Sequence, residues 1–324
     1  MSFFLSATGL SGLKSITLRE SMGQPVVQAD IVCTGLTAQI GDSCTIDLGE
    51  DADHGVVMTG GIVKKITQKR PGSDFDVTVY DILTRAVDHF IASDTPESPY
   101  TVSNRKAELL VGDLLALAGI TAFTYDATIF TFGTDPNNPT KINLISAWNF
   151  IEHINRVCGF TTFADTGGSV QFRDRKPYIV GGDVSEHTFT TGASGDILEI
   201  EYLKSDEGLR NRVVVYGAPG ITKTVSAVSP FLPSGFFKTL VVAHEGLIVN
   251  QQTANDTADV NLTMFNRLTE TVRLKSKGIR SVRCRDVVDI TEAFTGFVNA
   301  KFIVFAANHV ISPQGFSSDF TLVR

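Results

Sequence analysis

The chain has a single tryptophan, Trp148, and only four cysteines among its 324 residues. No two cysteines stand two or four positions apart, which leaves no zinc-ribbon or Cys-x-x-Cys redox spacing. Three of the four fall in apolar or alternating segments, a setting typical of buried free thiols in a protein that assembles in a reducing cytoplasm. The cysteines are Cys33, Cys44, Cys158 and Cys284.

Positive charge and long apolar runs are also scarce. Lys and Arg number 28 against 35 Asp and Glu, a net charge of −7, so the chain has no basic footprint for holding nucleic acid. Residues 1–95 contain seven of the basic and twelve of the acidic residues. No apolar run approaches the roughly 18 residues of a membrane span. Residues 1–5 lack the basic start and the long apolar stretch of a signal peptide. We therefore expect neither a membrane span nor a signal peptide in this protein.

Sequence motifs of catalysis and cofactor binding are absent or incomplete. The six histidines are scattered without an HExxH pair, and no GxSxG element occurs. Residues 217–224 resemble a phosphate-binding loop, but Thr222 stands before Lys223 where the motif needs glycine, so a turn is favoured. Residues 165–167 match an aspartic-protease triplet without a second copy in the chain, and Gly168 favours a hairpin turn there. We expect no enzymatic activity and no cofactor.

An acidic loop is the remaining candidate for a metal site. It contains Asp47, Glu50, Asp51 and Asp53. Grouped carboxylates can coordinate calcium through their oxygens, but the spacing of an EF-hand loop is absent. A solvated hairpin tip is therefore the favoured interpretation, with a calcium site as the alternative.

A pattern of short strands and turns occurs twice, once near each end of the chain. Residues 41–82 and residues 285–324 each predict a strand, a loop, a second strand, a turn with Pro and Gly, and a third strand. Such a pattern is typical of an antiparallel sheet or a small barrel. Two related units in one chain suggest two equivalent surfaces. Three copies of the chain would then present six similar units, which suits docking on a six-fold ring.

The middle of the chain has a different pattern, beginning after a Pro-containing boundary near residues 94–99. The apolar spacing predicts a helix over residues 103–118, with Ser103 as its N-cap and Gly119 as its stop. A second helix is predicted over residues 145–158, ended by a glycine, and a hairpin follows it. These elements indicate a small α+β domain over residues 96–195.

The last part of the chain, residues 196–324, predicts strands, one long helix at about 254–274, and strands again. Leu262, Phe265 and Leu268 lie on the apolar stripe of that helix. The fold class that follows is α+β and mainly β. It consists of a β-barrel domain over residues 1–95, the small α+β domain, and a second, related β-barrel domain over residues 196–324.

Several segments resemble one protein family. They are residues 1–95, 107–120, 148–160, 165–172 and 302–322, together with residues 205–217, whose sequence SDEGLRNRVVVYG is the most specific piece. The chain is similar to the baseplate or tail hub proteins of tailed bacteriophages, including late-control-protein-D-like proteins. It is also similar to the hub module of type VI secretion spikes. The resemblance covers nearly the whole chain by pattern rather than by one invariant motif.

The resemblance implies a homotrimer whose two tube-like barrels per chain form a pseudo-six-fold ring in a virion tail, assembled in the bacterial cytoplasm. Such a ring joins the hexameric tail tube, or a distal tail protein, to a three-fold spike or fibre and to other baseplate proteins. It leaves a channel through which genomic DNA passes without specific binding. An acidic channel would repel the DNA backbone, and the acidic loop with Asp47, Glu50, Asp51 and Asp53 is a candidate for its lining.

The helix stripe is a candidate for the contact between subunits. Leu262, Phe265 and Leu268 would then meet a neighbouring subunit, although the same residues could pack only on their own domain. A receptor- or carbohydrate-binding β-rich module of a virion is the alternative function. Trp148 lies on a helical core stripe rather than on a loop, which favours the hub.

Overall fold

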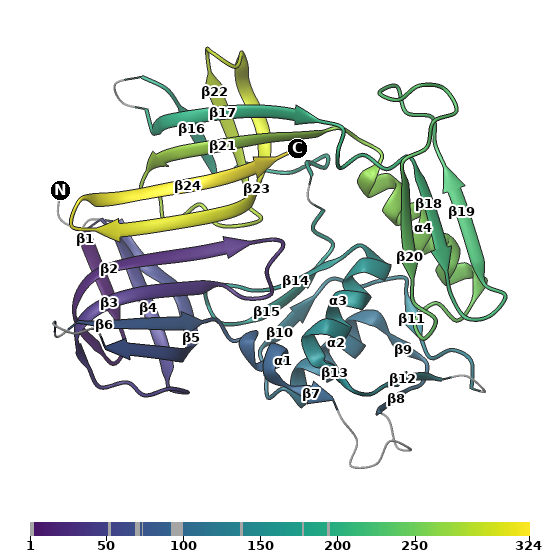
Figure 1. Ribbon diagram of the computed structural model, residues 1–324, viewed down its shortest axis with the longest axis horizontal. Coiled ribbons are helices and arrows are strands. Elements are labelled where there is room, and N and C mark those ends of the chain that lie inside the picture. The colour runs from purple at the N-terminus through teal and green to yellow at the C-terminus, as the bar shows by residue number, and fades with distance from the viewer. Residues whose placement is uncertain are drawn as a thin grey trace.

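A computed structural model describes residues 3–50, 53–68, 72, 74–91, 100–136, 139–176, 178–192 and 195–324. One large sheet contains strands from both ends of the chain, so the purple and yellow strands lie side by side in Figure 1. Helices α1–α3 lie to the lower right of the large sheet, and a small sheet with a long helix lies at the right of that view. The protein is mainly β, as the sequence predicts.

The first unit of the large sheet has the strand order β1-β4-β5-β6-β3-β2, with antiparallel neighbours throughout. Its strands alternate buried and exposed residues, and the side chains of Ile16, Leu18 and Ile31 are buried in one core. The strands are β1 (Phe3–Ala7), β2 (Leu10–Ser21), β3 (Gln28–Leu36), β4 (Ser43–Glu50), β5 (Asp53–Gln68) and β6 (Phe75–Tyr80).

The second unit repeats this order as β16-β22-β23-β24-β21-β17. Only its outermost pair differs, because β16 runs parallel to β22 whereas β1 runs antiparallel to β4. The predicted repeat is therefore present, and it is longer than the sequence pattern shows. The strands are β16 (His187–Thr190), β17 (Ile197–Ser205), β21 (Thr269–Lys277), β22 (Val287–Glu292), β23 (Phe297–Ser312) and β24 (Gly315–Val323).

The two units share their irregularities as well as their order. A register shift between Leu13 and Ser15 of β2 has its counterpart between Ile197 and Glu199 of β17. The shift between Val63 and Lys65 of β5 likewise matches that between Val304 and Ala306 of β23. Because a bulge changes which side chains face the core, matched bulges keep the same faces buried in both units.

The turn before β4 also recurs before β22. The carboxylate of Asp42 accepts a hydrogen bond from the N–H of Gln39 at 2.8 Å, and Asp286 accepts one from Arg283 at 2.7 Å. Gly41 in the first turn has φ 94, and its counterpart Arg285 has φ 82. An arginine rarely adopts this left-handed region. Arg285 adopts it because it occupies the position of the repeated turn that Gly41 occupies in the first unit.

The two units join directly, because β2 pairs with β23 over six residues from Ile16↔Ile311 to Ser21↔Ala306. We call this pairing the seam. The sequence predicts two related β-barrel domains, and the structure places the strands of both in one sheet. No pairing among the described strands closes either unit into a barrel, so closure stays a prediction, as do the ends of the three domains.

The middle of the chain contains the two predicted helices and the hairpin. Helix α2 (Ala107–Leu117) begins later than predicted, and its N-cap is Lys106 without a side-chain bond rather than Ser103. Helix α3 (Ala147–Cys158) is capped by Ser146 and ends at Gly159 in the left-handed region. The hairpin is β14 (Thr161–Ala164) with β15 (Val170–Arg173), and β10 (Phe123–Tyr125) runs parallel to β15.

Short elements complete this region. Helix α1 (Thr84–Asp88) follows the first unit, as the sequence allows. Three two-stranded pairs surround the helices. They are β7 (Phe90–Ile91) with β13 (Ile145–Ser146), β8 (Tyr100–Val102) with β12 (Thr140–Ile142), and β9 (Arg105–Lys106) with β11 (Thr131–Phe132).

The predicted helix at 254–274 is wrong at its C-terminal end. Helix α4 spans Gln251–Phe265, and Thr269–Lys277 form β21 of the large sheet. β-Branched residues favour a strand there, and pairing on both edges of β21 with β17 and β24 outweighs the helical apolar spacing. Leu268 therefore does not share a helix with Leu262.

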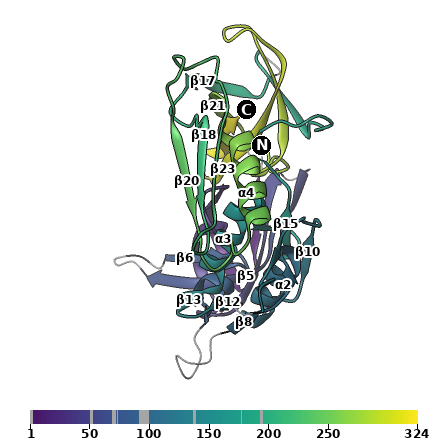
Figure 2. The same cartoon turned by 90° about the vertical axis from the view of Figure 1, so that its right-hand side faces the viewer.

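Helix α4 covers one face of a small three-stranded sheet, as Figure 2 shows. The strands are β18 (Arg212–Tyr216), β19 (Thr222–Ser226) and β20 (Thr239–Ala243), in the order β19-β18-β20. Val213 and Val215 of β18 are buried in the same core as the residues of α2 and α3. This core therefore ties the small sheet to the middle of the chain.

Two histidines connect α3 to the end of β20. Nδ1 of His244 accepts a hydrogen bond from the N–H of Leu247 at 3.1 Å, so its proton lies on Nε2 and is donated to Nδ1 of His153 at 3.0 Å. Burial, together with the neighbouring His153, lowers the pKa of His244 to about 4. The contact therefore exists with both rings neutral.

This pair predicts an acid-sensitive stability. The unfolded chain binds a proton at His244 near the ordinary pKa of 6.5, whereas the folded chain binds it only near 4, so stability falls as pH falls through this window. His244→Asn keeps an acceptor for Leu247 and cannot be protonated. Urea unfolding at several pH values should show a smaller loss of unfolding free energy between pH 6.5 and 4 in the variant than in the wild type. Equal losses would contradict the assignment.

Candidate functional site

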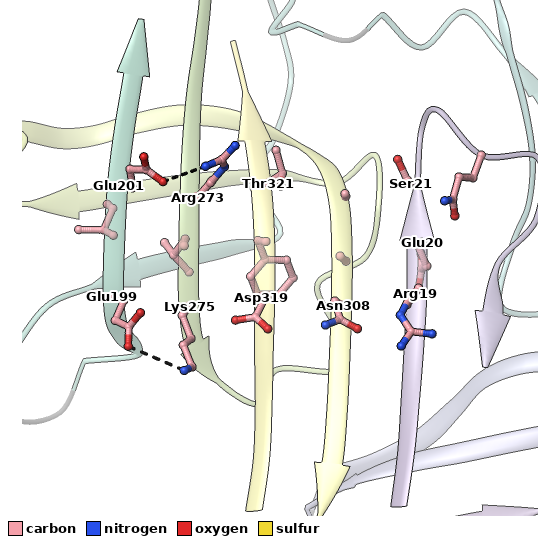
Figure 3. Close-up of a pocket in the computed structure, with 16 residues that line it drawn as sticks. Arg19, Glu20, Ser21, Glu199, Glu201, Arg273, Lys275, Asn308, Asp319 and Thr321 are labelled. Atoms are coloured by element: carbon pink, nitrogen blue, oxygen red, sulfur yellow. Dashed lines mark hydrogen bonds and ion pairs between the residues drawn. The ribbon is translucent and has the colours of Figure 1, made fainter. Parts of the chain in front are cut away.

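One face of the large sheet is polar where the strands cross the seam. Two rows of side chains run across the five strands β2, β23, β24, β21 and β17, as Figure 3 shows. Lateral neighbours in each row come from consecutive strands. The first row is Arg19, Asn308, Asp319, Lys275 and Glu199, and the second is Ser21, Ala306, Thr321, Arg273 and Glu201.

Charges of both signs alternate along these rows. Glu201 accepts a hydrogen bond from Arg273 at 3.2 Å, and Lys275 lies 3.8 Å from Glu199. The rows line an open hollow of about 700 Å³. Because the paired side chains are largely exposed, each pair contributes little to stability. The face is a wetted surface of balanced charge, without a concentration of cations that would hold a phosphate backbone.

The seam is fastened on the opposite, buried side of the same strands. The carboxylate of Glu20 on β2 forms an ion pair with the guanidinium of Arg283, and both side chains are largely buried. Arg283 Nη1 also donates to the carbonyl of Val57 on β5 at 3.0 Å, and the N–H of Cys284 donates to Glu20 at 3.3 Å. One arginine of the second unit thereby contacts two strands of the first.

Breaking this pair should be costly. Glu20→Gln keeps the size of the side chain but leaves the Arg283 cation buried without a carboxylate, which typically costs about 3–5 kcal/mol. Glu201→Gln is the matched control, because its pair with Arg273 is exposed and should be worth under about 1 kcal/mol. Chemical denaturation of both variants measures the difference. Equal destabilisation would show that the Glu20 pair does not fasten the seam.

The acidic loop lies at the tip of the β4–β5 hairpin, where Glu50 pairs with Asp53 in register. Nδ1 of His54 lies 3.1 Å from the carboxylate of Asp47. Arg280 of the second unit donates to the Asp53 carboxylate at 2.6 Å. Asp51 lies outside the described residues. The described part of the chain holds no group of three or more metal-binding side chains, and the observed pairing fits the hairpin tip.

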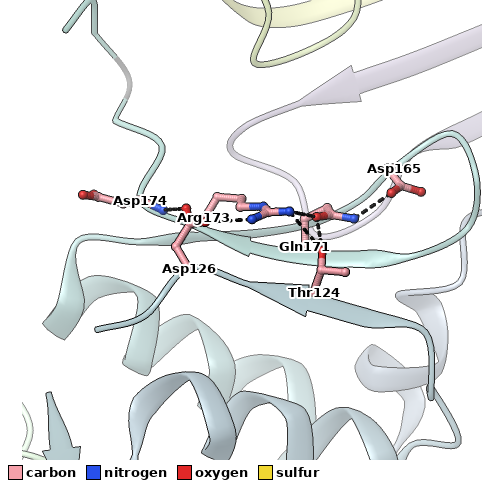
Figure 4. A network of polar contacts seen from close by, with 6 residues as sticks. All are labelled: Thr124, Asp126, Asp165, Gln171, Arg173 and Asp174. Atoms are coloured by element: carbon pink, nitrogen blue, oxygen red, sulfur yellow. Dashed lines mark hydrogen bonds and ion pairs between the residues drawn. The ribbon is translucent and has the colours of Figure 1, made fainter. Parts of the chain in front are cut away.

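Asp165 belongs to a structural network in the β10-β15-β14 sheet, shown in Figure 4. It accepts hydrogen bonds from the N–H of Ser169 at 2.9 Å and from Nε2 of Gln171 at 2.6 Å. Arg173 donates to Gln171 at 2.7 Å and to Asp126 at 2.7 Å. The carboxylate closes the hairpin turn, as the sequence favours. Residues 217–221 likewise form a turn before β19.

The three predicted interface residues do not share one helix stripe. Leu262 is partly buried and packs against the core that α2 and α3 share. Phe265 is the last residue of α4, lines open clefts at that end, and its carbonyl accepts a hydrogen bond from the N–H of Arg210 at 2.8 Å. Leu268 lies in the link to β21.

Sequence reasoning missed the residues that define the seam. Glu20 and Arg283 carry no motif, and they are 263 positions apart in the chain. It also missed that residues 10–36 repeat as β17 and β21. The signal that could have revealed this repeat is the alternating pattern that the two stretches share, in which Ile16 and Leu18 correspond to Ile200 and Tyr202. The two stretches have few residue types in common, so the pattern is weak.

The described residues contain no helix that is long and apolar enough to span a membrane. No protein-family profile matches the chain, and no curated protein matches its sequence.

The fold is found in solved structures of phage-type tail proteins and of type VI secretion components. A tail protein from Neisseria meningitidis has a TM-score of 0.70 and 14% identity, over 100% of this chain and 97% of its own. The 43 kDa tail protein of prophage MuSo2 from Shewanella oneidensis has a TM-score of 0.65 and 15% identity, over 99% and 97% of the two chains. A type VI secretion system component from E. coli has a TM-score of 0.57 and 9% identity, over 98% and 76%. The fold expected from the sequence resemblance is confirmed.

Proposed function

We propose that this protein is the structural hub of a phage-type tail, without enzymatic activity of its own. The observation that carries the proposal is the repeated six-stranded unit, joined side by side in one sheet within a chain that has the tail-protein fold. Three chains then present six similar units and form a pseudo-six-fold ring. A ring of this kind matches a hexameric tail tube on one side and a three-fold spike or fibre on the other.

The balanced polar face suits the inside of that ring. DNA passing through should not be held, and the rows of Arg19 and Glu199 offer no excess of positive charge. The acidic hairpin tip with Asp47, Glu50 and Asp53 adds negative charge at the rim of the channel. The partners are further copies of the chain, a tube or distal tail protein, and spike, fibre and baseplate proteins. Assembly takes place in the bacterial cytoplasm and the product lies in the virion tail.

A binding module for a receptor or carbohydrate is less well supported. Such a site usually exposes aromatic rings on its surface. Trp148 is buried on α3, but Phe231, Phe236 and Phe294 are exposed, so the internal repeat and not the aromatic content argues against this function. The hub is the simpler explanation of an internal repeat that matches down to its bulges.

The solution mass of the purified chain tests the hub. Light scattering should give the mass of three chains, and class averages of the same sample in negative stain should show rings with a central hole. A single-chain mass at every concentration, with no ring in the presence of tail-tube protein, would contradict the proposal.

We further propose that Leu262 and Phe265 at the C-terminal end of α4, with Leu268 in the link to β21, contact the neighbouring subunit. Phe265→Glu places a charge in an open cleft at that end. We expect the trimer to dissociate at least ten-fold more readily, measured by light scattering over a dilution series, while the circular dichroism of the chain is unchanged. An intact trimer with unchanged stability would remove this role.

A further inference from the structure

The internal repeat leaves two strand edges without the partner that their counterparts have. At the seam, the outer edge of β2 pairs with β23. The counterpart of β2 in the second unit is β17, which pairs only with β21 among the described strands and ends the sheet. A nine-residue edge strand with free N–H and C=O groups is a template for another strand.

The second open edge is on β5. Strand β23 pairs with β22 up to Ile303 and then, on the same edge, with β2 from Ala306 onward. Its counterpart β5 pairs with β4 up to Ile62, and the same edge of β5 carries no strand over Lys65–Gln68 in the described chain. Each chain therefore has one complete seam and the two halves of a second.

The matched registers specify how the two halves fit. The bulges align Leu18 with Tyr202 and Arg19 with Leu203, and they align His309 with Gln68 and Asn308 with Thr67. The seam pairs Leu18↔His309 and Arg19↔Asn308 thus correspond to residues of β17 and β5 that lie on the two unpaired edges of the described sheet. The equivalent pairs are Tyr202↔Gln68, Leu203↔Thr67, Lys204↔Ile66 and Ser205↔Lys65.

Exposed apolar side chains mark the same two edges. Ile40, in the repeated turn, is 68% exposed, whereas its counterpart Cys284 is 6% exposed beneath the seam. Tyr202 is 38% exposed, whereas its counterpart Leu18 is fully buried. Ile40 and Tyr202 occupy positions that the complete seam buries, so a partner strand at the open edges would cover them too.

We propose that β17 of one chain pairs antiparallel with residues 65–68 of β5 in a second copy of this chain, in the register Tyr202↔Gln68 and Leu203↔Thr67. The inference rests on the hub function, and it names the contact that closes the ring. Because the two edges lie on different parts of the chain, the contact is head-to-tail, and repeating it with a rotation of one third of a turn generates a closed ring of three chains. In a trimer, three internal seams alternate with three seams between chains.

Disulfide capture tests the register. The side chains of Leu203 and Thr67 lie at positions equivalent to Arg19 and Asn308 on the wetted face, so cysteine at both should not disturb the core. Within one chain, seven strand spacings of about 4.8 Å separate β17 from β5, so the two cysteines cannot meet without a second chain. The native cysteines are buried and free.

Leu203→Cys with Thr67→Cys should give mostly covalent species of up to three chains on a non-reducing denaturing gel after mild oxidation. Lys204→Cys with Thr67→Cys is the matched control, because adjacent strand residues face opposite sides of the sheet and should not cross-link.

Ile40→Asp should weaken association at least ten-fold by light scattering, whereas Val228→Asp, at a loop residue 94% exposed and away from both edges, should not.

The outcomes separate this inference from the hub itself. A three-chain mass without in-register cross-linking, or with equal cross-linking in the control pair, would overturn the strand pairing and leave the hub standing. A single-chain mass without any cross-link would overturn both. In-register cross-linking to three chains, with the control pair unlinked, supports the proposed seam between chains.

Discussion

The hydrogen bonding of β2 to β23 is the interaction on which the rest of the structure depends. It turns two short repeated units into one sheet, so that neither unit exposes its edge at the junction. It also gives the sheet two distinct faces. One buries the cores of both units, and the other carries the rows of balanced charge.

A buried ion pair fixes this seam where backbone pairing alone would allow slippage. A shift of one residue would exchange the buried face and the wetted face, but a shift of two residues would leave every side chain on its own face. Glu20 and Arg283 remove that freedom, since a charge moved out of register would be buried without its partner. The bond from Arg283 to Val57 extends the constraint to the middle of the first unit.

The repeat also accounts for features that are otherwise isolated. Arg285 has a positive φ, as does Gly41, which occupies the equivalent position in the turn of the first unit. The exposed Ile40 and Tyr202 occupy positions that are covered in the complete seam. Internal repetition and unpaired edges are thus two consequences of the same geometry, because a sheet that repeats laterally ends in edges complementary to each other.

The sequence by itself determined the local elements. Strand alternation predicted the mainly β class, the apolar spacing and Gly159 predicted α3, and the Asp-Thr-Gly-Gly run predicted a hairpin rather than a catalytic triplet. These outcomes depend on residues within one or two turns of each other.

Tertiary structure decided what depends on distant partners. Thr269–Lys277 became a strand because both of its edges found neighbours, and Glu20 met Arg283 across most of the chain. No local pattern records which strands will lie side by side, because that choice is made by burial and pairing over the whole sheet.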